Sequence, residues 1–282
     1  MKVFGLDFTS APRSEKPITK AHCVFEKGIL TLFHEIEPLT DFDHFEAFLN
    51  GDDQWIAGID FPFGQPRKLV TDLSWPQTWE GYVQKIAKMK KEEFGELLGE
   101  YRVRRKTGDK QHKRYTDERA KSLSPMMWYG VPVGKMFFEG APRLLQSKAC
   151  VMPFRKPEQD RGIVVEAYPA LVARKIIGHR RYKSDDKKKW TKDREAARQE
   201  VVRFLQSGEL PDMYGFQVKL PDPLAGQLIH DATGDRLDAV LCAIQAAWAY
   251  SQKEQHYGIP TTCDRLEGWI VDPEMLSAKD TR

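Results

Sequence analysis

Short apolar runs that each end at an acidic residue recur along the chain. The first run covers residues 3–6 and ends at Asp7, after which turn-forming residues follow at once. A short and almost continuous apolar run is typical of a strand buried on both faces of a sheet. A carboxylate at the end of such a strand is costly to bury unless a positive charge meets it. Alone, this pattern also fits an aspartate that bonds only its own turn.

Two later segments repeat the pattern. Residues 55–59 lead to Asp60, and residues 163–165 lead to Glu166, each with a proline shortly beyond the acid. Proline interrupts a strand because it has no N–H group to donate to the ladder. We therefore predict three buried strands that carry an acid at or near their ends.

The elements between the first two acids predict how their strands pair. Residues 18–26 and 29–37 are rich in strand-forming residues and are separated by Lys27 and Gly28, which predicts a hairpin. Residues 42–49 have apolar positions at helical spacing. A helical crossover makes neighbouring strands parallel. Asp7 and Asp60 are therefore predicted to lie side by side at one edge of the sheet.

The segment from residue 65 to residue 160 has a different pattern, and we predict a mostly helical insertion there. An amphipathic helix is expected over residues 82–101. A basic segment follows, and it fits either a nucleic-acid-binding surface or a solvated loop. Its cationic residues are Arg102, Arg104, Arg105, Lys106, Lys110, Lys113 and Arg114.

The last part of the chain predicts helices over residues 170–177 and 186–206, and then a strongly apolar helix that begins near Asp235. Asp235 and Asp238 are three residues apart and therefore lie on neighbouring positions of this helix. Asp235 also fits a helix N-cap. Asp238 lies beside the apolar stripe and is expected to face the sheet.

Composition and charge narrow the class of protein. The 282 residues are 41% apolar, which suffices for a full hydrophobic core. The net charge is only +3, so an affinity for nucleic acid must come from where the charges lie. The four cysteines are far apart, and neither a signal peptide nor a membrane-spanning run is present, so we expect a cytoplasmic protein without membrane attachment.

The predicted convergence of acids suggests a metal centre. Side chains at the carboxyl ends of neighbouring parallel strands meet at one crevice. Oxygen ligands without histidine or cysteine suit Mg²⁺ or Mn²⁺. Two such ions about 4 Å apart activate water for in-line attack on a phosphodiester. The sequence therefore predicts a hydrolase, a nuclease with one or two ions.

The segments GLDFTSAP, GIDFPFG, VVEAYP and GDRLDAVLCAI resemble the ribonuclease H superfamily. Within it the chain is similar to the predicted nucleases grouped as domain of unknown function 429, and DRLDAVLCAI resembles the last motif of Holliday-junction resolvases. The resemblance implies an α/β fold with a five-stranded mixed sheet flanked by helices, built from residues 1–64 and 161–282. Residues 65–160 are not covered by it.

The same resemblance implies roles for the acids. Asp7 would bridge the metals, Asp60 and Asp238 would complete the sites, and Asp235 or Glu166 would be an outer ligand. The implied catalytic residues are thus Asp7, Asp60, Glu166 and Asp238, and the implied metal ligands are Asp7, Asp60, Asp235 and Asp238. The superfamily often has glutamate where this chain has Asp60.

Other functions fit parts of the pattern. Actin-like ATPases and sugar kinases share the core fold, and the residues after Asp7 resemble their first phosphate loop, but no further glycine-rich phosphate loop is present. A nucleic-acid-binding module with structural carboxylates is a third option. His230 is a candidate proton shuttle, although a lone histidine is more often a packed or surface residue. The sequence does not distinguish DNA from RNA as the partner, nor single-stranded from duplex or junction substrates. It also leaves open whether the protein is a monomer or a homodimer.

Overall fold

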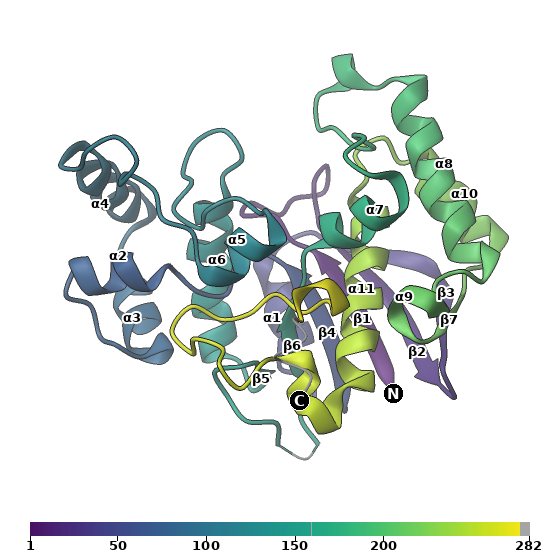
Figure 1. Cartoon of the computed structure of the whole chain (residues 1–282), viewed down its shortest axis with the longest axis horizontal. Coiled ribbons are helices and arrows are strands. Elements are labelled where there is room, and N and C mark those ends of the chain that lie inside the picture. The colour runs from purple at the N-terminus through teal and green to yellow at the C-terminus, as the bar shows by residue number, and fades with distance from the viewer. Residues whose placement is uncertain (159, 277–282) are drawn as a thin grey trace.

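The computed structural model describes residues 1–158 and 160–276, and within them one mixed sheet has helices against both faces (Figure 1). The sheet of this described part has seven strands in the order β5-β6-β4-β1-β2-β3-β7. The strands are β1 (Lys2–Asp7), β2 (Ile18–Glu26), β3 (Ile29–Leu39), β4 (Trp55–Asp60), β5 (Cys150–Val151), β6 (Ile163–Glu166) and β7 (Gln217–Lys219).

The predicted hairpin forms between β2 and β3, which pair antiparallel. Lys27 and Gly28 connect them with φ angles of 50° and 75°, the left-handed backbone that a tight hairpin turn requires. β1 pairs antiparallel with β2, so the first three strands form an antiparallel meander.

The predicted crossover also forms. Helix α1 (Phe42–Leu49) follows β3, and its N-cap Asp41 accepts a hydrogen bond from the backbone N–H of His44. The chain then enters β4, which pairs parallel with β1 so that Asp7 lies opposite Asp60. β4 pairs parallel with β6 in turn. The prediction that Asp7 and Asp60 end adjacent parallel strands is confirmed.

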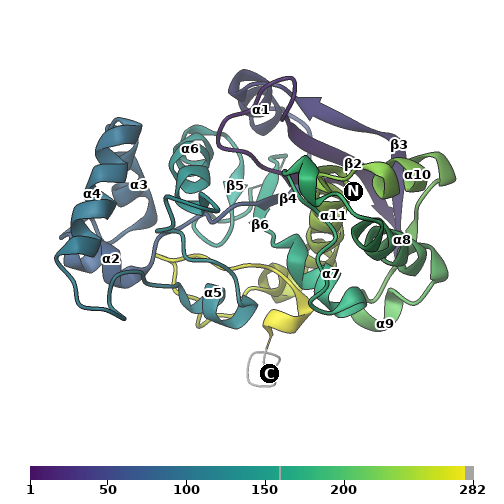
Figure 2. The same cartoon turned by 90° about the horizontal axis from the view of Figure 1, so that it is seen from above.

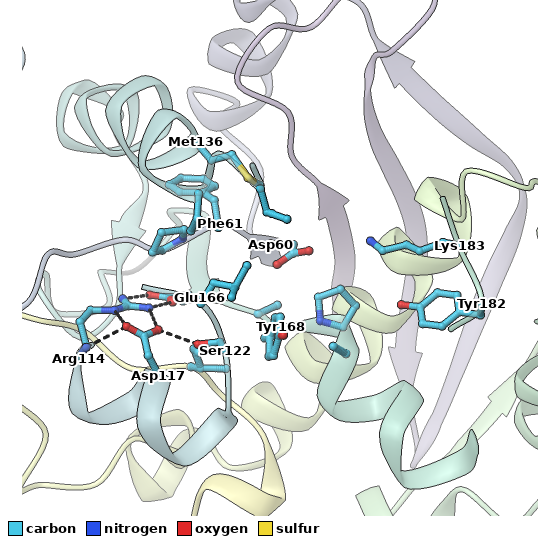
Figure 3. A pocket seen from close by; sticks show the side chains of 18 residues that line it. Asp60, Phe61, Arg114, Asp117, Ser122, Met136, Glu166, Tyr168, Tyr182 and Lys183 are labelled. Atoms are coloured by element: carbon cyan, nitrogen blue, oxygen red, sulfur yellow. Dashed lines mark hydrogen bonds and ion pairs between the residues drawn. The ribbon is translucent and has the colours of Figure 1, made fainter. Parts of the chain in front are cut away.

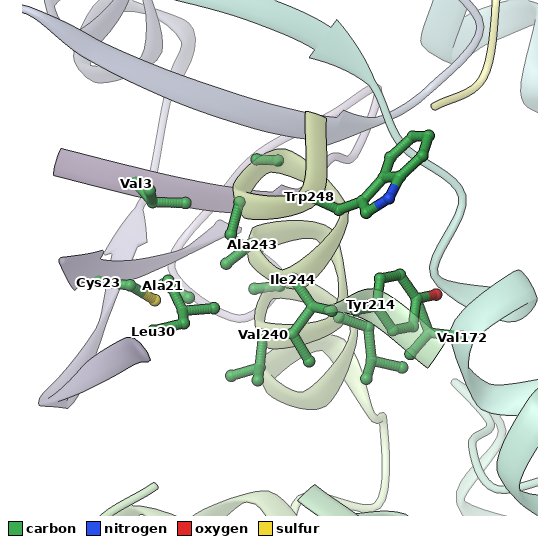
Figure 4. Packing of buried hydrophobic residues seen from close by; sticks show 14 of the residues in the cluster. Val3, Ala21, Cys23, Leu30, Val172, Tyr214, Val240, Ala243, Ile244 and Trp248 are labelled. Atoms are coloured by element: carbon green, nitrogen blue, oxygen red, sulfur yellow. The ribbon is translucent and has the colours of Figure 1, made fainter. Parts of the chain in front are cut away.

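One face of the sheet is covered by the buried helix α11 (Asp235–Ser251), whose apolar side packs against β1 and β2 (Figure 4). Two glycines allow α11 to approach closely. A Cβ at Gly5 would collide with the backbone at Ala239 and Ala243, and a Cβ at Gly58 would collide with the carbonyl of Cys242. This close packing places the first turns of α11 beside the ends of β1 and β4.

Further helices lie beside α11 on the same face. The chain reaches α11 through α7 (Pro169–Ile177), α8 (Lys192–Ser207), α9 (Pro211–Tyr214) and α10 (Asp222–His230). The helices predicted over 170–177 and 186–206 correspond to α7 and α8, although α8 begins later, after a short 3₁₀ turn at Lys187–Lys189.

The segment from residue 65 to residue 160 is mostly helical, and its first helices lie at the end of the molecule opposite α8 and α10 (Figure 2). Its elements before β5 are α2 (Arg67–Asp72), α3 (Trp79–Ile86), α4 (Lys91–Val103), α5 (Tyr115–Ala120) and α6 (Val133–Gln146). The single helix predicted over residues 82–101 is wrong, because Lys90 has an extended backbone (ψ 154°) that separates α3 from α4.

This segment shares a hydrophobic core with the sheet. Trp79, Phe94 and Phe137 belong to the same buried cluster as Leu6 and Ile59. β5 pairs with β6 and so extends the sheet itself. The segment is therefore packed onto the sheet, and the division into 1–64, 65–160 and 161–282 stays a prediction. Residues 277–282 of the last range lie outside the described residues.

The α/β class is confirmed, but the described sheet is wider than the five strands expected. The additional strands β5 and β7 have two and three residues and lie at the two edges. Such short strands leave almost no periodic pattern in a sequence. Among the described residues, no helix is both long enough and apolar enough to span a membrane.

Candidate metal centre

Three aspartates from three elements meet above the carboxyl ends of β1 and β4. Carboxylate oxygens of Asp7, Asp60 and Asp238 all lie within 4.8 Å of one another. Asp7 and Asp60 are partly buried, and Asp238 has no exposed surface. Three of the four predicted metal ligands are thus brought together by folding.

Two carboxylates of this centre, those of Asp7 and Asp60, resist ionisation. Burial raises the pKa of Asp60 to about 7; Lys183 lowers it, whereas Asp238 and Glu166 raise it further. Burial also raises the pKa of Asp7 well above its usual value; Lys183 opposes the rise, and Asp235, Asp238 and Asp60 add to it. Like charges this close cannot all ionise unless a cation offsets them.

The segment between α7 and α8 supplies a positive charge that offsets part of the negative charge of these carboxylates. The Tyr182 hydroxyl donates to Oδ1 of Asp238 at 2.5 Å, and Lys183 Nζ donates to Oδ2 of the same carboxylate. Both oxygens of the buried Asp238 therefore have partners. Neither Tyr182 nor Lys183 was identified from the sequence; the only signal was the basic run at residues 179–189, HRRYKSDDKKK.

Asp235 lies in the first turn of α11, near the three aspartates but outside their cluster. Burial raises its pKa to about 6; Lys16 and Lys183 lower it, and Asp238 raises it. The N-cap position belongs to Gly234, so the interpretation of Asp235 as a cap is wrong. Asp235 is partly buried and fits an outer position around the centre.

Glu166 does not join the centre, contrary to its predicted catalytic role. Arg114 donates to Oε1 of Glu166 at 2.5 Å and to Oε2 at 2.8 Å, and the backbone N–H of Phe63 donates to Oε2 at 2.9 Å. Arg114 also binds Asp117 (Figure 3). Glu166 lies outside the cluster of three aspartates and is bound to Arg114, so it serves a buried ion pair.

The basic segment also differs from its predicted role in nucleic-acid binding. Arg114 is only 1% exposed and is held by two acids, so it cannot contact a phosphate on the surface. Arg105 pairs with Asp72 and Asp109, while Arg104 pairs with Glu100. Arg102 is half-buried. Because of these ion pairs, less of the positive charge of this segment is available to bind phosphate groups than the sequence alone indicates.

The lysines of this segment, Lys106, Lys110 and Lys113, are exposed. They follow α4, which both views place at the end of the molecule away from α8 (Figures 1 and 2). His230 ends α10, with Nδ1 3.5 Å from Glu195, and is not in the carboxylate cluster.

The donor set fits a hard divalent cation. All three clustered ligands are carboxylates, and oxygen ligands suit Mg²⁺ or Mn²⁺ better than zinc. A cation at this position would remove the mutual repulsion of Asp7, Asp60 and Asp238. A cavity of about 240 Å³ adjoins the centre and shares Asp60 and Lys183 with it (Figure 3).

Comparison with known proteins gives a family but no function. No curated protein and no solved structure matches the chain. A family profile described as a protein of unknown function (DUF429) matches residues 19–262, a range that includes Asp60 and Asp238 and begins after Asp7. Because this match covers most of the sequence, the chain belongs to the DUF429 family.

Proposed function

We propose that this protein is a nuclease that hydrolyses phosphodiester bonds with the help of Mg²⁺ or Mn²⁺. The observation that carries the proposal is the cluster of Asp7, Asp60 and Asp238, whose oxygens lie within 4.8 Å of one another. These residues are distant in sequence, and burial, together with the neighbouring carboxylates, raises the pKa of Asp7 and of Asp60. Unfavourable clusters of this kind are characteristic of functional sites.

The sheet gives independent support. Its five inner strands have the order β6-β4-β1-β2-β3, with β2 antiparallel to β1 and with β4 and β6 parallel. This arrangement is similar to the ribonuclease H superfamily, in which carboxylates on the first and fourth strands and on a later helix hold metal. Asp7, Asp60 and Asp238 occupy corresponding elements.

The chain's own residues divide the work between them. Asp7 and Asp60 are partly buried and would supply oxygens to one or two ions, while Tyr182 and Lys183 fix the orientation of Asp238. A bound ion would polarise the attacking water and stabilise the leaving oxygen. Lys183 is 40% exposed and lies where an incoming phosphate would gain from its charge.

Nucleic acid is the partner that we propose for this chemistry. The basic run at residues 179–189 includes the exposed side chains of Arg181, Lys187 and Lys188, close in sequence to Lys183. Exposed cations beside a phosphodiester-cleaving centre would hold the backbone of a strand. All four cysteines are free, which fits a reducing compartment such as the cytoplasm.

The test is a cleavage screen with labelled single-stranded, duplex and junction substrates of DNA and RNA. We expect at least one substrate to be cut with Mn²⁺ or Mg²⁺ and to stay intact with chelator. Asp60→Asn should abolish cleavage, whereas Asp53→Asn, an exposed aspartate paired with Lys2, should not. Stabilisation by ATP without any cleavage would contradict a nuclease and favour a phosphotransferase.

A further inference from the structure

A cavity of about 240 Å³ opens beside Asp60, one of the three clustered aspartates (Figure 3). Asp60, Tyr182 and Lys183 form its side toward the metal centre. A group that occupies this cavity is therefore close to any phosphate held at the centre. Neither the proposed hydrolysis nor the metal ligands account for this space.

The walls of the cavity are mainly apolar. They include Phe61, Met136 and Tyr168, together with Pro169 and Ala170 at the start of α7. Apolar and aromatic walls favour a ligand with flat apolar faces rather than another phosphate or a sugar. Ligand pockets for drug-sized molecules begin at about 300 Å³, so this one suits a single small ring system.

Polar groups also line the cavity: the mutually paired Arg114, Asp117 and Glu166, and the hydroxyl groups of Ser122 and Tyr168. Ser122 Oγ donates to Asp117 Oδ1 at 2.9 Å and keeps its lone pairs available for a ligand. The Tyr168 hydroxyl accepts from Arg174 at 2.9 Å and keeps its own proton to donate. A planar ring with both donors and acceptors on its edge matches this combination.

We propose that this cavity binds one unpaired nucleobase of the nucleic-acid strand whose phosphate lies at the aspartates. The inference rests on the proposed function and adds a substrate class to it. In a duplex the bases are stacked and paired, so a base can enter only from a single strand or after extrusion from a helix. The preferred substrate is thus a strand with at least one unpaired nucleotide at the cut.

The rim of the cavity agrees with entry of a base from solvent. Leu123 and Val131, both among the lining residues, are 40% and 56% exposed. Exposed apolar side chains of this size gain from covering by a ring. The neighbouring exposed Arg181 can hold the backbone of the same strand.

Binding measured with Ca²⁺, which avoids cleavage, tests this cavity. The probes are a labelled ten-nucleotide single strand, an abasic strand of the same length and charge, the corresponding duplex, and ATP. We expect the full chain to bind the base-bearing strand about tenfold more tightly than the abasic strand or the duplex, from stacking of one base. Equal affinity for the base-bearing and abasic strands would overturn the inference.

A variant that fills the cavity gives the second arm. Ala170→Trp should reduce binding of the base-bearing strand to the abasic level, and Ala170→Ser, which leaves the space open, should not. Mn²⁺ affinity should be the same in both variants, since Ala170 is outside the metal cluster. If Ala170→Trp folds normally and keeps the preference for bases, the cavity is not the base site.

The outcomes separate this inference from the proposed nuclease. Metal-dependent cleavage without any preference for base-bearing strands would overturn the base site alone. Failure to bind any strand would overturn both. If ATP binds more tightly than the single strand, the base in the cavity belongs to a free nucleotide and not to a nucleic acid, which would overturn the inference.

Discussion

Lys183 donates a charge-assisted hydrogen bond to Asp238, a carboxylate with no exposed surface. The lysine side chain itself is 40% exposed, so it can move away from Asp238 without a large loss of packing contacts. It supplies one positive charge to a cluster of three carboxylates. With all three aspartates ionised, Lys183 leaves two negative charges, which one divalent ion neutralises.

Replacing Lys183 should therefore change metal binding. We expect Lys183→Met to bind Mn²⁺ about tenfold more tightly than the unaltered protein, because a repelling charge is removed from the cluster. Titration calorimetry gives both the affinity and the number of ions. Without metal, the variant should be less stable, because Asp238 loses one partner of its buried charge.

Lys16→Met is the matched control, since Lys16 lies near Asp235 and pairs with the exposed Asp185. Its Mn²⁺ affinity should change less than that of Lys183→Met. Unchanged or weaker Mn²⁺ binding in Lys183→Met would show that this lysine does not oppose the ion.

Asp7→Asn should abolish cleavage without unfolding the chain. Asp7 is an acid of the cluster and its pKa is raised mainly by burial, so a neutral amide of the same size relieves a folding cost while it removes a metal ligand. We expect at least a hundredfold loss of cleavage rate and weaker Mn²⁺ binding. Thermal unfolding without metal should occur at the same or a higher temperature. Persistent cleavage would remove Asp7 from the mechanism.

Stability without metal should decrease as the pH rises through neutrality. The pKa of Asp60 is about 7 in the folded protein, above its value of about 4 in an unfolded chain. The folded state therefore holds this proton more tightly. The stabilisation that the protonated Asp60 gives to the folded state is complete below about pH 4 and is lost as the pH rises through about 7.

Urea unfolding at pH 5 and pH 8 with chelator measures this effect. Asp60→Asn should remove about 2 kcal/mol of the pH dependence. Saturating Mn²⁺ should restore stability at pH 8 in the unaltered protein, because the ion replaces the proton. The same pH dependence in Asp60→Asn would mean that other groups cause it.

Replacing Glu166 should lower the stability of the folded protein and change its affinity for metal only slightly. Glu166→Gln leaves the buried Arg114 with a weaker partner, and loss of one member of a buried pair costs about 3 kcal/mol. Urea unfolding should show this loss, while Mn²⁺ affinity stays within about twofold of the original. Glu158→Gln, in an exposed pair with Arg161, should cost less than about 1 kcal/mol. A large loss of Mn²⁺ affinity in Glu166→Gln would restore Glu166 as a ligand.

The parts of the site that could be predicted depend on local pattern and on connection rules. Asp7 and Asp60 follow apolar runs, and the helix between their strands requires a parallel pair. Asp238 follows from its place beside the apolar stripe of α11. These signals lie within a few residues of each acid.

Charge partners, by contrast, depend on packing between distant segments. Glu166 and Asp60 look alike in sequence, as acids that end buried strands, yet Glu166 meets Arg114 from 52 residues away. Nothing near either residue in sequence distinguishes the two cases. Lys183 was missed for the same reason, because one lysine in a basic run looks like any other.

The final prediction concerns which basic residues hold nucleic acid. Lys183 in the run at residues 179–189 contacts the metal centre through Asp238. Lys106, Lys110 and Lys113 lie between α4 and α5, and α4 is at the end of the molecule away from α8 (Figure 1). We expect glutamine at three exposed positions of the first run to weaken binding more than three such changes after α4. The first set is Arg181, Lys187 and Lys188, and the second is Lys106, Lys110 and Lys113.

Fluorescence anisotropy over a range of salt concentrations compares the two triple variants. For a single strand, each lost phosphate contact reduces the magnitude of the slope of log K against log salt by about 0.7. The slope of the first triple variant should therefore be smaller in magnitude by about 2. The second variant should keep the original slope, because a strand at the aspartates reaches the 179–189 run first. A larger loss in the second variant would mean that the strand runs across α4 and the helices of the 65–160 segment.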